Sequence, residues 1–331
     1  MKSLLSVEVG GPDTLVLSDI DAPTAGPGEV VIDVHAASVN FPDVLIIEDL
    51  YQLKPPRPFA PGAEVSGVIS SVGEGVESFA IGDRVLSAPG HGGMTEQIAV
   101  PAATVIPIPD GMPHDEAASF LLTYGTSHHA LRQRAIAKEG ETLFILGAAG
   151  GVGLAAVQLG KAMGLTVIAG CSSQEKVDLC IENGADSGIV YPHGPLDRDA
   201  QKALSSEIKA AGGGGVDIVY DAVGGDFAEP ALRAMNWEGR FLVIGFPAGI
   251  PKIPLNLALL KSCQIVGVFW GAFTMVSPDI HRANVEELFT MYAAGKIKPH
   301  VTSRYPLSEG AEAIRELAER RAKGKVVVEV R

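Results

Sequence analysis

Cysteine is scarce in this 331-residue chain, which has only Cys171, Cys180 and Cys263 and no CxxC pair. A set so sparse and odd in number excludes a disulfide framework and a cysteine zinc cluster. Long apolar runs are also missing, since no stretch approaches the roughly 18 residues of a membrane span. The first residues, Met1-Lys2-Ser3, lack the apolar run of a secretory signal. We therefore predict a soluble, cytoplasmic protein that does not bind a membrane.

Basic residues are few, 26 against 39 acidic ones, and the formal net charge is −13. Binding to nucleic acid through its phosphates needs clustered Lys and Arg, so a small-molecule substrate is expected and a nucleic-acid partner is not. Hydrophobic residues make up 47 % of the chain, which is too much for intrinsic disorder. The length also exceeds what one ordinary core accommodates, which predicts two domains.

The pattern of strands and turns changes along the chain. Up to about residue 120, short alternating runs between Gly and Pro turns are typical of an antiparallel β-rich domain or barrel. Helical patterns at 115–122 and 126–137 follow, and six β-branched runs then alternate with helices, which predicts a doubly wound parallel sheet. The predicted strands are 142–146, 166–169, 188–191, 217–220, 240–244 and 264–268, and the predicted helices are 152–163, 174–183, 199–211, 227–235, 256–260 and 278–294. A last helix at 307–323 precedes a strand at 325–330, which we expect to return to the first domain.

A glycine-rich turn connects the first strand of the alternating part to its helix. Ala148, Gly150 and Gly153 occupy the three positions of the G-x-G-x-x-G pattern of dinucleotide-binding turns. Gly150 would let the backbone approach a pyrophosphate, and Gly153 would let the helix pack closely on the strand. The helix N-terminus would offer free N–H groups to the phosphates. The residues expected at the cofactor here are Ala149, Gly150, Gly151, Val152 and Gly153.

The residues after the second strand indicate which dinucleotide binds. NAD sites usually carry an Asp or Glu there, which accepts a hydrogen bond from the ribose 2′-hydroxyl. Here the chain reads Cys171-Ser-Ser-Gln-Glu-Lys176, and Ser172, Ser173 and Lys176 suit the 2′-phosphate of NADPH. Glu175 can point away on a helix, and Ser172 can also cap that helix without losing its other role. NADPH is the predicted cofactor.

Six motifs in order resemble the medium-chain dehydrogenase/reductase superfamily, and within it the zinc-free, zeta-crystallin-like group of NADPH:quinone oxidoreductases. They are ASVNFPD (37–43), PFAPGAE (58–64), VGEGV with GDR (72–76 and 82–84), AAGGVG (148–153), DAVGG (221–225) and GKVV (324–327). The resemblance implies an α/β protein with a GroES-like β-rich catalytic domain over 1–122 and 296–331. It implies a Rossmann doubly wound parallel-sheet domain over 123–295, and a homodimer joined through the strand at 264–268.

Zinc-dependent members of the superfamily need ligands that this sequence replaces. Asn40 stands at the position of their cysteine ligand and Ala63 at that of their histidine ligand, while 121–126 offers no Cys or acid for the third. The four-cysteine structural lobe that follows the GDR motif in those relatives is absent as well. His128 and His129 do not replace the site, because neighbouring helical residues point about 100° apart. No metal is therefore predicted.

Without zinc to acidify an alcohol, hydride delivery to an acceptor that is already electrophilic is favoured. The resemblance puts three catalytic candidates, Tyr51, Asn40 and Asp43, beside the nicotinamide. The Tyr51 phenol and the Asn40 amide can donate hydrogen bonds to a developing oxyanion. Asp43 can equally hold a loop, and Tyr51 can simply line a wall.

The resemblance also implies contacts with the rest of the cofactor. Thr126 would face the pyrophosphate or the nicotinamide ribose, and Lys176 and Tyr191 would lie near the 2′-phosphate. Phe246, Phe269 and Lys325 would border the remaining cofactor surface. Tyr191 can instead be an ordinary strand aromatic. Phe269 and Trp270 can form an apolar slot, part of a core or a dimer surface.

The function predicted on these grounds is NADPH-dependent, zinc-independent reduction of quinones or α,β-unsaturated carbonyl compounds. An enoyl-thioester reductase is an alternative, although it would need a basic patch and 52–59 offers only Lys54 and Arg57. A non-catalytic, crystallin-like protein that binds a dinucleotide or RNA is the other alternative, and the charge of −13 opposes RNA.

Overall fold

The computed structural model describes all 331 residues, which divide into two compact units. Unit 1 comprises Met1–Leu122 and Pro299–Arg331, and unit 2 comprises Thr123–Lys298. No helix of either unit is long and apolar enough to cross a membrane. The tail of the chain therefore belongs with the N-terminal part, and unit 2 is an insertion in unit 1.

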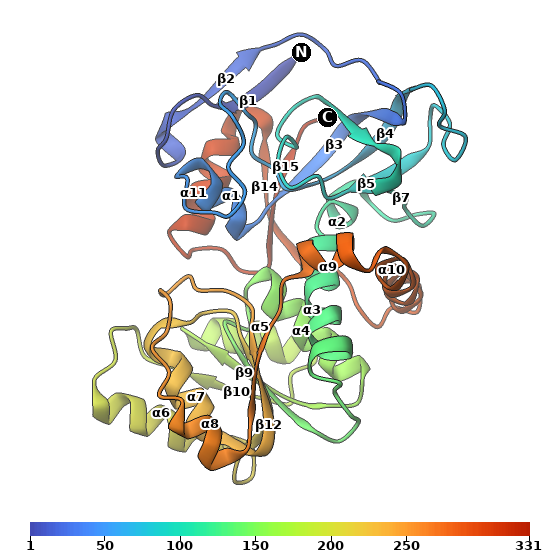
Figure 1. Cartoon of the computed structure of the whole chain (residues 1–331). Helices are drawn as coiled ribbons and strands as arrows, with labels where there is room; N and C mark the ends of the chain where they lie inside the picture. Colours follow the sequence, from blue (N-terminus) through green and yellow to red (C-terminus); the bar gives the residue numbers. More distant parts are fainter. The chain divides into compact units, whose positions relative to one another are not determined.

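Unit 1 is built on a largely antiparallel sheet with the strand order β14-β15-β3-β4-β5-β7 (Figure 1). The central strand β3 is long enough to pair with β15 through its second half and with β6 through its first half, while β4 covers its other edge. A separate pair, β1 and β2, completes the strands. The strands are β1 (Lys2–Ser6), β2 (Leu15–Asp19), β3 (Glu29–Val39), β4 (Glu64–Val72), β5 (Arg84–Ser87), β6 (Gln97–Pro101), β7 (Val105–Pro107), β14 (Val301–Pro306) and β15 (Lys325–Glu329).

Three short α-helices accompany this sheet: α1 (Phe41–Ile47), α2 (His114–Ala117) and α11 (Gly310–Ala318). Helices α1 and α11 pack against each other and cover one apolar cluster, which includes Val34, Ile47 and Val326. A second cluster, around Ile32 and Val85, is formed by side chains of the strands β3 to β7. The predicted tail helix is shorter than expected, since a 3-10 turn at Leu307–Glu309 precedes α11 and the helix ends at Ala318.

Unit 2 contains a six-stranded sheet of order β10-β9-β8-β11-β12-β13 in which every pairing is parallel. This order confirms the predicted doubly wound Rossmann sheet. The strands are β8 (Thr142–Leu146), β9 (Thr166–Cys171), β10 (Ser187–Val190), β11 (Val216–Asp221), β12 (Met235–Val243) and β13 (Gln264–Gly267). Central strands such as β8 are buried on both faces, which explains their unbroken apolar sequences.

The helices of unit 2 connect these strands. They are α3 (Thr126–His129), α4 (Gly151–Ala162), α5 (Gln174–Glu182), α6 (Arg198–Ala211), α7 (Ala228–Ala234), α8 (Asn256–Lys261), α9 (Trp270–Val276) and α10 (Pro278–Ala293). Around α3 the chain is helical with π-helical turns at Leu121–Gly125 and Ala130–Arg134, in place of the two regular helices predicted there. Helix α9 was not predicted, and Trp270 lies in it.

Candidate active site

The glycine turn of unit 2 has the geometry of an anion-binding helix start. Helix α4 begins at Gly151, and its N-cap residue, Gly150, is exposed and supplies no side chain to the free N–H groups of the first turn. A methyl group added at Gly150 would lie 3.4 Å from the Gly147 carbonyl oxygen, so the protein itself leaves room there. At Gly153 the same methyl would lie 2.2 Å from that oxygen. Gly153 thus allows helix and strand to pack closely, while Gly150 leaves the helix start open to an anion such as a pyrophosphate.

A hydroxyl beside Thr126 fixes this helix start. Ser127 Oγ donates a hydrogen bond to the Val152 carbonyl at 2.8 Å, and it lies 2.9 Å from the buried Tyr220 hydroxyl. Thr126 is the half-buried neighbour of Ser127, which brings it close to the first turn of α4. The sequence offered no signal for Ser127, because its partners are 25 and 93 residues away.

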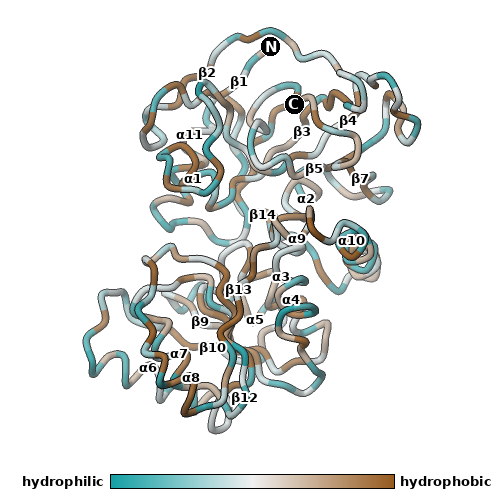
Figure 2. The backbone as a smooth tube through the Cα atoms, viewed as in Figure 1, coloured by the Kyte–Doolittle hydropathy of each residue, from teal (hydrophilic) through white to brown (hydrophobic).

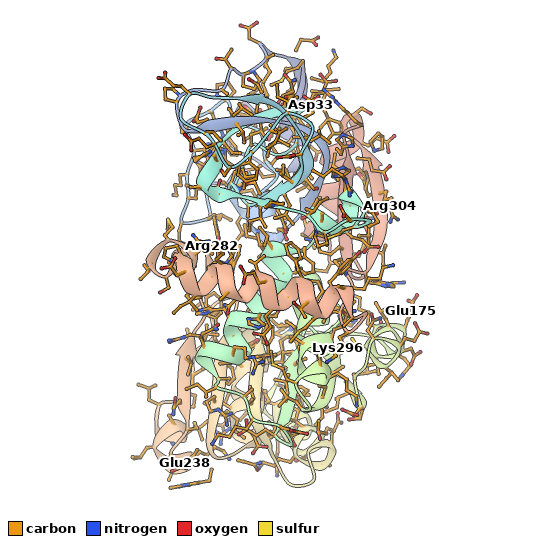
Figure 3. The ribbon with its side chains drawn as sticks, turned by 90° about the vertical axis from the view of Figure 1, so that its right-hand side faces the viewer. Asp33, Glu175, Glu238, Arg282, Lys296 and Arg304 are labelled. Atoms are coloured by element: carbon orange, nitrogen blue, oxygen red, sulfur yellow. The ribbon has the colours of Figure 1, made fainter.

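The loop after β9 carries the residues predicted for a 2′-phosphate. Ser173, not Ser172, is the N-cap of α5: its Oγ accepts a hydrogen bond from the Lys176 N–H at 3.4 Å. The alternative in which Ser172 caps the helix is wrong: α5 starts at Gln174, as predicted, and the residue before it is Ser173. The half-buried Ser172 therefore keeps its hydroxyl outside the cap. Glu175 is exposed on α5, as Figure 3 shows.

The three aromatic residues predicted to contact the cofactor differ in how far they are exposed to solvent. Tyr191 is buried, its ring lies 5.0 Å from that of Phe227, and its N–H donates to the Cys171 carbonyl. Phe246 and Phe269, which follow β12 and β13, are 40 % and 59 % exposed. Tyr191 thus belongs to the core of unit 2 beside the Ser172 loop, whereas the two phenylalanines offer apolar surface after neighbouring strand ends.

Asp221 lies at the end of β11 and was not among the predicted site residues. Its Oδ1 accepts hydrogen bonds from the Val223 N–H at 2.9 Å and the Gly224 N–H at 2.8 Å. Burial raises the pKa of this carboxyl to about 6, and the two N–H groups oppose the rise. The DAVGG motif is therefore a turn built around a buried acid, a role that its Asp-x-x-Gly spacing could have indicated.

In unit 1, the predicted catalytic residues belong to a buried polar network. Lys325 Nζ donates to Asn40 Oδ1 at 2.7 Å and to the Val39 carbonyl at 3.1 Å. Asn40 Nδ2 donates in turn to Ser38 Oγ at 3.0 Å and, less closely, to the Ser38 carbonyl at 3.3 Å. Both ends of the Asn40 amide are thus engaged by protein groups, and Lys325 is only 5 % exposed.

Two buried carboxyl groups complete the network. Asp43 accepts from the Asn40 N–H and the Gly62 N–H, each at 2.8 Å. Glu64 accepts from Ser38 Oγ at 3.1 Å and from the Leu122 N–H at 3.0 Å. Burial raises the pKa of Asp43 to about 6 and that of Glu64 to about 7, against the attraction of the Lys325 charge. Asp43 therefore holds together the start of α1 and the loop at Gly62, as a capping residue does.

Ser38 and Glu64 were missed by sequence reasoning, although a signal for them existed. They face each other in the β3–β4 pairing, and Ser38 lies two residues before Asn40, the residue that directly follows β3. The contact of Lys325 with Asn40 follows from the register in which Val326 pairs with Val39. That contact joins residues 285 positions apart and could not be predicted without the fold.

Tyr51 lies in the loop after α1 and is half-buried against the apolar cluster of unit 1. Burial raises the pKa of its phenol, and the Asp43 carboxylate raises it further. Arg57 ties the end of this loop to the body of the unit, donating to Asp49 Oδ1 at 2.9 Å and to the Ile47 carbonyl at 2.8 Å. The Tyr51 hydroxyl is therefore protonated at neutral pH and can donate a hydrogen bond.

No group of three or more His, Cys, Asp or Glu side chains lies close enough to hold a metal ion. At the positions where zinc-dependent relatives have a cysteine and a histidine ligand, Asn40 is bound to Lys325 and Ala63 has no ligand atom. An ammonium group beside Asn40 also repels a cation. The residues present here do not fit a zinc ion.

Comparison with known proteins identifies both units. Residues 26–110 match the alcohol dehydrogenase GroES-like domain, and residues 151–286 match the zinc-binding dehydrogenase domain. The second match begins at residue 151 and so includes none of the positions discussed for zinc.

Full-length similarity is found as well. The chain is 34 % identical over 331 residues to a quinone oxidoreductase-like protein 2 homolog of Nematostella vectensis, covering 99 % of this chain and 88 % of that protein. It is 32 % identical to the quinone oxidoreductase of Rattus norvegicus, covering 99 % and 97 %. The structure of Escherichia coli quinone oxidoreductase complexed with NADPH superposes with a TM-score of 0.90 at 27 % identity, over the whole of both chains.

A GroES-like unit joined to a Rossmann unit defines a medium-chain dehydrogenase/reductase. Within that superfamily the chain belongs to the quinone oxidoreductase-like group, as predicted, and it is an oxidoreductase.

Proposed function

We propose that the protein is an NADPH-dependent, zinc-independent reductase that transfers hydride to quinones or α,β-unsaturated carbonyl compounds. The observation that carries this proposal is the contact between Lys325 and Asn40. An ammonium and an amide stand where zinc-dependent relatives hold a metal ligand, so no Lewis acid is provided to activate an alcohol. The favoured acceptor is then one that needs no such activation.

The residues of unit 2 fit NADPH. The open helix start at Gly150 suits the pyrophosphate, and the Ser172 hydroxyl and the Lys176 side chain suit a 2′-phosphate. No acid ends β9, where NAD sites usually carry one. Quinone oxidoreductase of Escherichia coli, whose structure contains NADPH, supports the same cofactor. When bound, NADPH supplies the hydride.

Of the candidate residues in unit 1, one can donate a hydrogen bond to the substrate and the others hold the surrounding structure in place. Tyr51 remains protonated and half-exposed, so its hydroxyl is the group available to hydrogen-bond an acceptor oxygen that gains negative charge. Asn40 is held from both sides, by Lys325 and by Ser38, and Asp43 is held by two backbone N–H groups. Asn40 and Asp43 therefore act by fixing the wall beside Tyr51, and a proton for the reduced product comes from Tyr51 or from water.

The test measures NADPH oxidation against a panel of quinones, 2-alkenals, enones and enoyl-CoA esters. We expect turnover with at least one quinone or enone, and NADPH preferred to NADH. Turnover confined to enoyl-CoA esters would favour the thioester reductase instead. A protein that binds NADPH but oxidises it with no member of the panel would contradict an enzymatic role.

We also propose a homodimer that forms through β13. This strand is at the edge of the sheet, Ile265 on it is 39 % exposed, and Leu259 of the preceding helix is 80 % exposed. Figure 2 marks the segment at β13 as predominantly hydrophobic. An exposed apolar edge strand is normally covered by a partner. The free thiols of all three cysteines suit a cytoplasmic location.

A further inference from the structure

Two of the three cysteines, Cys171 and Cys180, lie together in unit 2, although they are nine positions apart in the chain. Cys171 is the last residue of β9, and Cys180 is on the inner face of α5. Their Sγ atoms are 3.7 Å apart and both side chains are buried. A disulfide needs the two sulfurs at about 2.05 Å, so a shift of less than about 2 Å shared between a strand end and a short helix joins them.

The pair is directly connected to the glycine turn. The Ala149 N–H donates a hydrogen bond to Cys171, and Cys171 is followed at once by Ser172 and Ser173, the residues we assign to the 2′-phosphate. Helix α5, which carries Cys180, also carries Lys176, and its start is capped by Ser173. Both parts of the dinucleotide site in unit 2 therefore rest on these two thiols.

We propose that Cys171 and Cys180 are an oxidisable dithiol, a modification site that hydrogen peroxide converts to a disulfide and whose oxidation opposes NADPH binding. The oxidation itself is independent of the proposed function. Its effect on the cofactor rests on the proposed function, because that function assigns NADPH to this turn.

The chemistry needs one peroxide molecule and no other reactant. The Cys171 sulfur attacks one peroxide oxygen, the O–O bond breaks, and a sulfenic acid and one water result. The Cys180 sulfur then displaces the hydroxyl group of the sulfenic acid, and its thiol proton leaves with that hydroxyl as a second water. Two thiols lose two electrons in forming the S–S bond, and one hydrogen peroxide is reduced to two waters.

The local chemistry assigns the roles of the two sulfurs. A hydrogen bond from the Cys180 thiol lowers the pKa of Cys171, and the Ala149 N–H and the Lys176 charge lower it further, against burial. The pKa of Cys180 is raised by the same hydrogen bond and by burial. Cys171, whose sulfur also accepts the Ala149 N–H, is thus the more acidic thiol and is assigned the attack, and Cys180 is assigned the resolving role. Burial of both excludes bulky reagents and leaves a small oxidant such as peroxide.

Oxidation and cofactor binding should oppose each other. Closing the S–S bond draws the Cys171 sulfur from Ala149 and draws α5 toward β9, which displaces the turn and the Ser172 loop together. By linkage, a ligand that binds only the dithiol form must protect the dithiol from oxidation by the same factor. Couplings of this kind are commonly about fivefold or more in affinity.

The test uses the Cys263→Ser variant of the full chain, so that only the pair can react. Peroxide treatment should remove both thiols, counted after denaturation, and lower the intact mass by two hydrogen atoms, with no disulfide-linked dimer on a denaturing, non-reducing gel. The oxidised protein should bind NADPH at least about fivefold more weakly, and dithiothreitol should restore binding. Saturating NADP⁺, which is not a reductant, should slow the loss of thiols. A Cys180→Ala, Cys263→Ser control should form no disulfide, and its intact mass should not fall by two hydrogen atoms.

Each failure has its own meaning. A persistent count of two thiols, or oxidation of the pair only to sulfinic acids, overturns the dithiol. A disulfide that forms equally fast with NADP⁺ bound, and that leaves NADPH affinity unchanged, overturns the coupling. Failure of the reduced protein to bind NADPH at all overturns the proposed function instead, and does so before any peroxide is added.

Discussion

At the scale of single residues, the buried charges of unit 1 are held in balance by Lys325. One ammonium group, that of Lys325, lies near two carboxyl groups, Asp43 and Glu64, and all three side chains are buried. Burial alone disfavours every one of these charges, whereas backbone N–H groups and mutual attraction favour them. The outcome lies between the two extremes: the pKa values of Asp43 and Glu64, about 6 and about 7, are raised but still compatible with ionisation near neutral pH.

Replacing Lys325 with Met is therefore expected to destabilise unit 1 strongly. The change leaves two buried carboxyl groups without a cation, and breaking a buried pair in this way costs about 3–5 kcal/mol. Denaturant unfolding measures the loss, with the exposed Lys54→Met as the matched control. Adding Glu64→Gln to Lys325→Met should recover part of the stability. A single variant within about 1 kcal/mol of the parent, the range of exposed ion pairs, would mean that the network is not charged.

Replacing Tyr51 with Phe removes one hydroxyl and little else. We expect kcat/KM for the preferred acceptor to fall by about 10- to 100-fold, because a donor to a developing oxyanion is lost. The Kd of NADPH should stay within about twofold, which is less than one lost hydrogen bond. Steady-state kinetics and a cofactor titration distinguish the two effects. An unchanged kcat/KM on every accepted substrate would show that Tyr51 only lines the site and does not donate a hydrogen bond to the substrate.

At the scale of elements, the start of α4 depends on two glycines for different reasons. Gly153 is needed by the fold, since a side chain there would meet the Gly147 carbonyl at 2.2 Å. Gly150 has an ordinary φ of −78° and room for a methyl group, so the fold does not require it. The fold would accept a side chain at position 150, yet the dinucleotide pattern has glycine there. We therefore expect that glycine at this position is needed by the ligand and not by the fold.

Alanine at each of these positions should separate folding from binding. Gly150→Ala is expected to change the unfolding free energy by less than about 0.5 kcal/mol, as surface substitutions do. It should weaken NADPH binding by about tenfold, because one hydrogen bond to a charged group is worth about this much. Gly153→Ala should destabilise unit 2 by about 1–3 kcal/mol, the usual cost of overpacking. Thermal unfolding and a fluorescence titration with NADPH measure the two effects. Equal NADPH affinity for Gly150→Ala and the parent would refute the assignment of the turn.

The elements that sequence could predict are those whose pattern is local. Strand β8 was predicted at 142–146 and is found at Thr142–Leu146, because an apolar run bounded by turn residues determines it. Helix α1 was missed, since its start reads Phe-Pro and its end Val-Leu-Ile-Ile, a β-branched sequence that only the Asn40 and Asp43 cap and tertiary packing make helical. Helix α9 was missed because Phe269 to Val276 is apolar apart from Thr274 and shows no helical periodicity.

The site was predictable to a similar degree. The glycine turn and the Ser172 loop follow from motifs within about 30 residues of one another, a span that one βαβ unit covers. The Lys325 network and the Cys171–Cys180 contact depend on strand register and helix packing, which no local pattern encodes.

At the scale of the whole molecule, the buried carboxyl groups make stability depend on pH. Burial raises the pKa of Glu64 from 4.5 to about 7, so between these values the folded protein keeps a proton that the unfolded chain has released. Because the folded state then binds more protons, the unfolding free energy falls as pH rises through this window. Asp43 acts in the same direction between 3.8 and about 6.

Glu64→Gln should therefore flatten the pH dependence. Between about pH 5 and pH 7 the unfolding free energy of the parent should fall by about 2 kcal/mol more than that of the variant, on the scale of about 1.4 kcal/mol per pKa unit. Urea unfolding across the range measures this, with the exposed Glu77→Gln as the control. If the unfolding free energies of the parent and of Glu64→Gln changed in parallel with pH, Glu64 would not be the group that holds the extra proton of the folded state.

The edge strand β13 determines the expected assembly. Ile265→Lys puts a charge on an exposed apolar edge, and charged residues at such edges prevent strand pairing. We expect the parent to sediment as a dimer and the variant as a monomer with an unchanged circular dichroism spectrum. Analytical ultracentrifugation decides between them, and a monomeric parent would remove the basis of the dimer.

Strand β15 determines the order in which the molecule can be completed. It pairs with β3 and β14 in the sheet of unit 1, yet it consists of Lys325–Glu329, which leave the ribosome after every residue of unit 2. Domains fold as they emerge during synthesis, so unit 2 has its full sequence available first. Until β15 arrives, Asn40 has no ammonium partner and the sheet of unit 1 has an open edge at β3. The order of synthesis therefore allows the Rossmann unit to fold before the N-terminal unit receives β15.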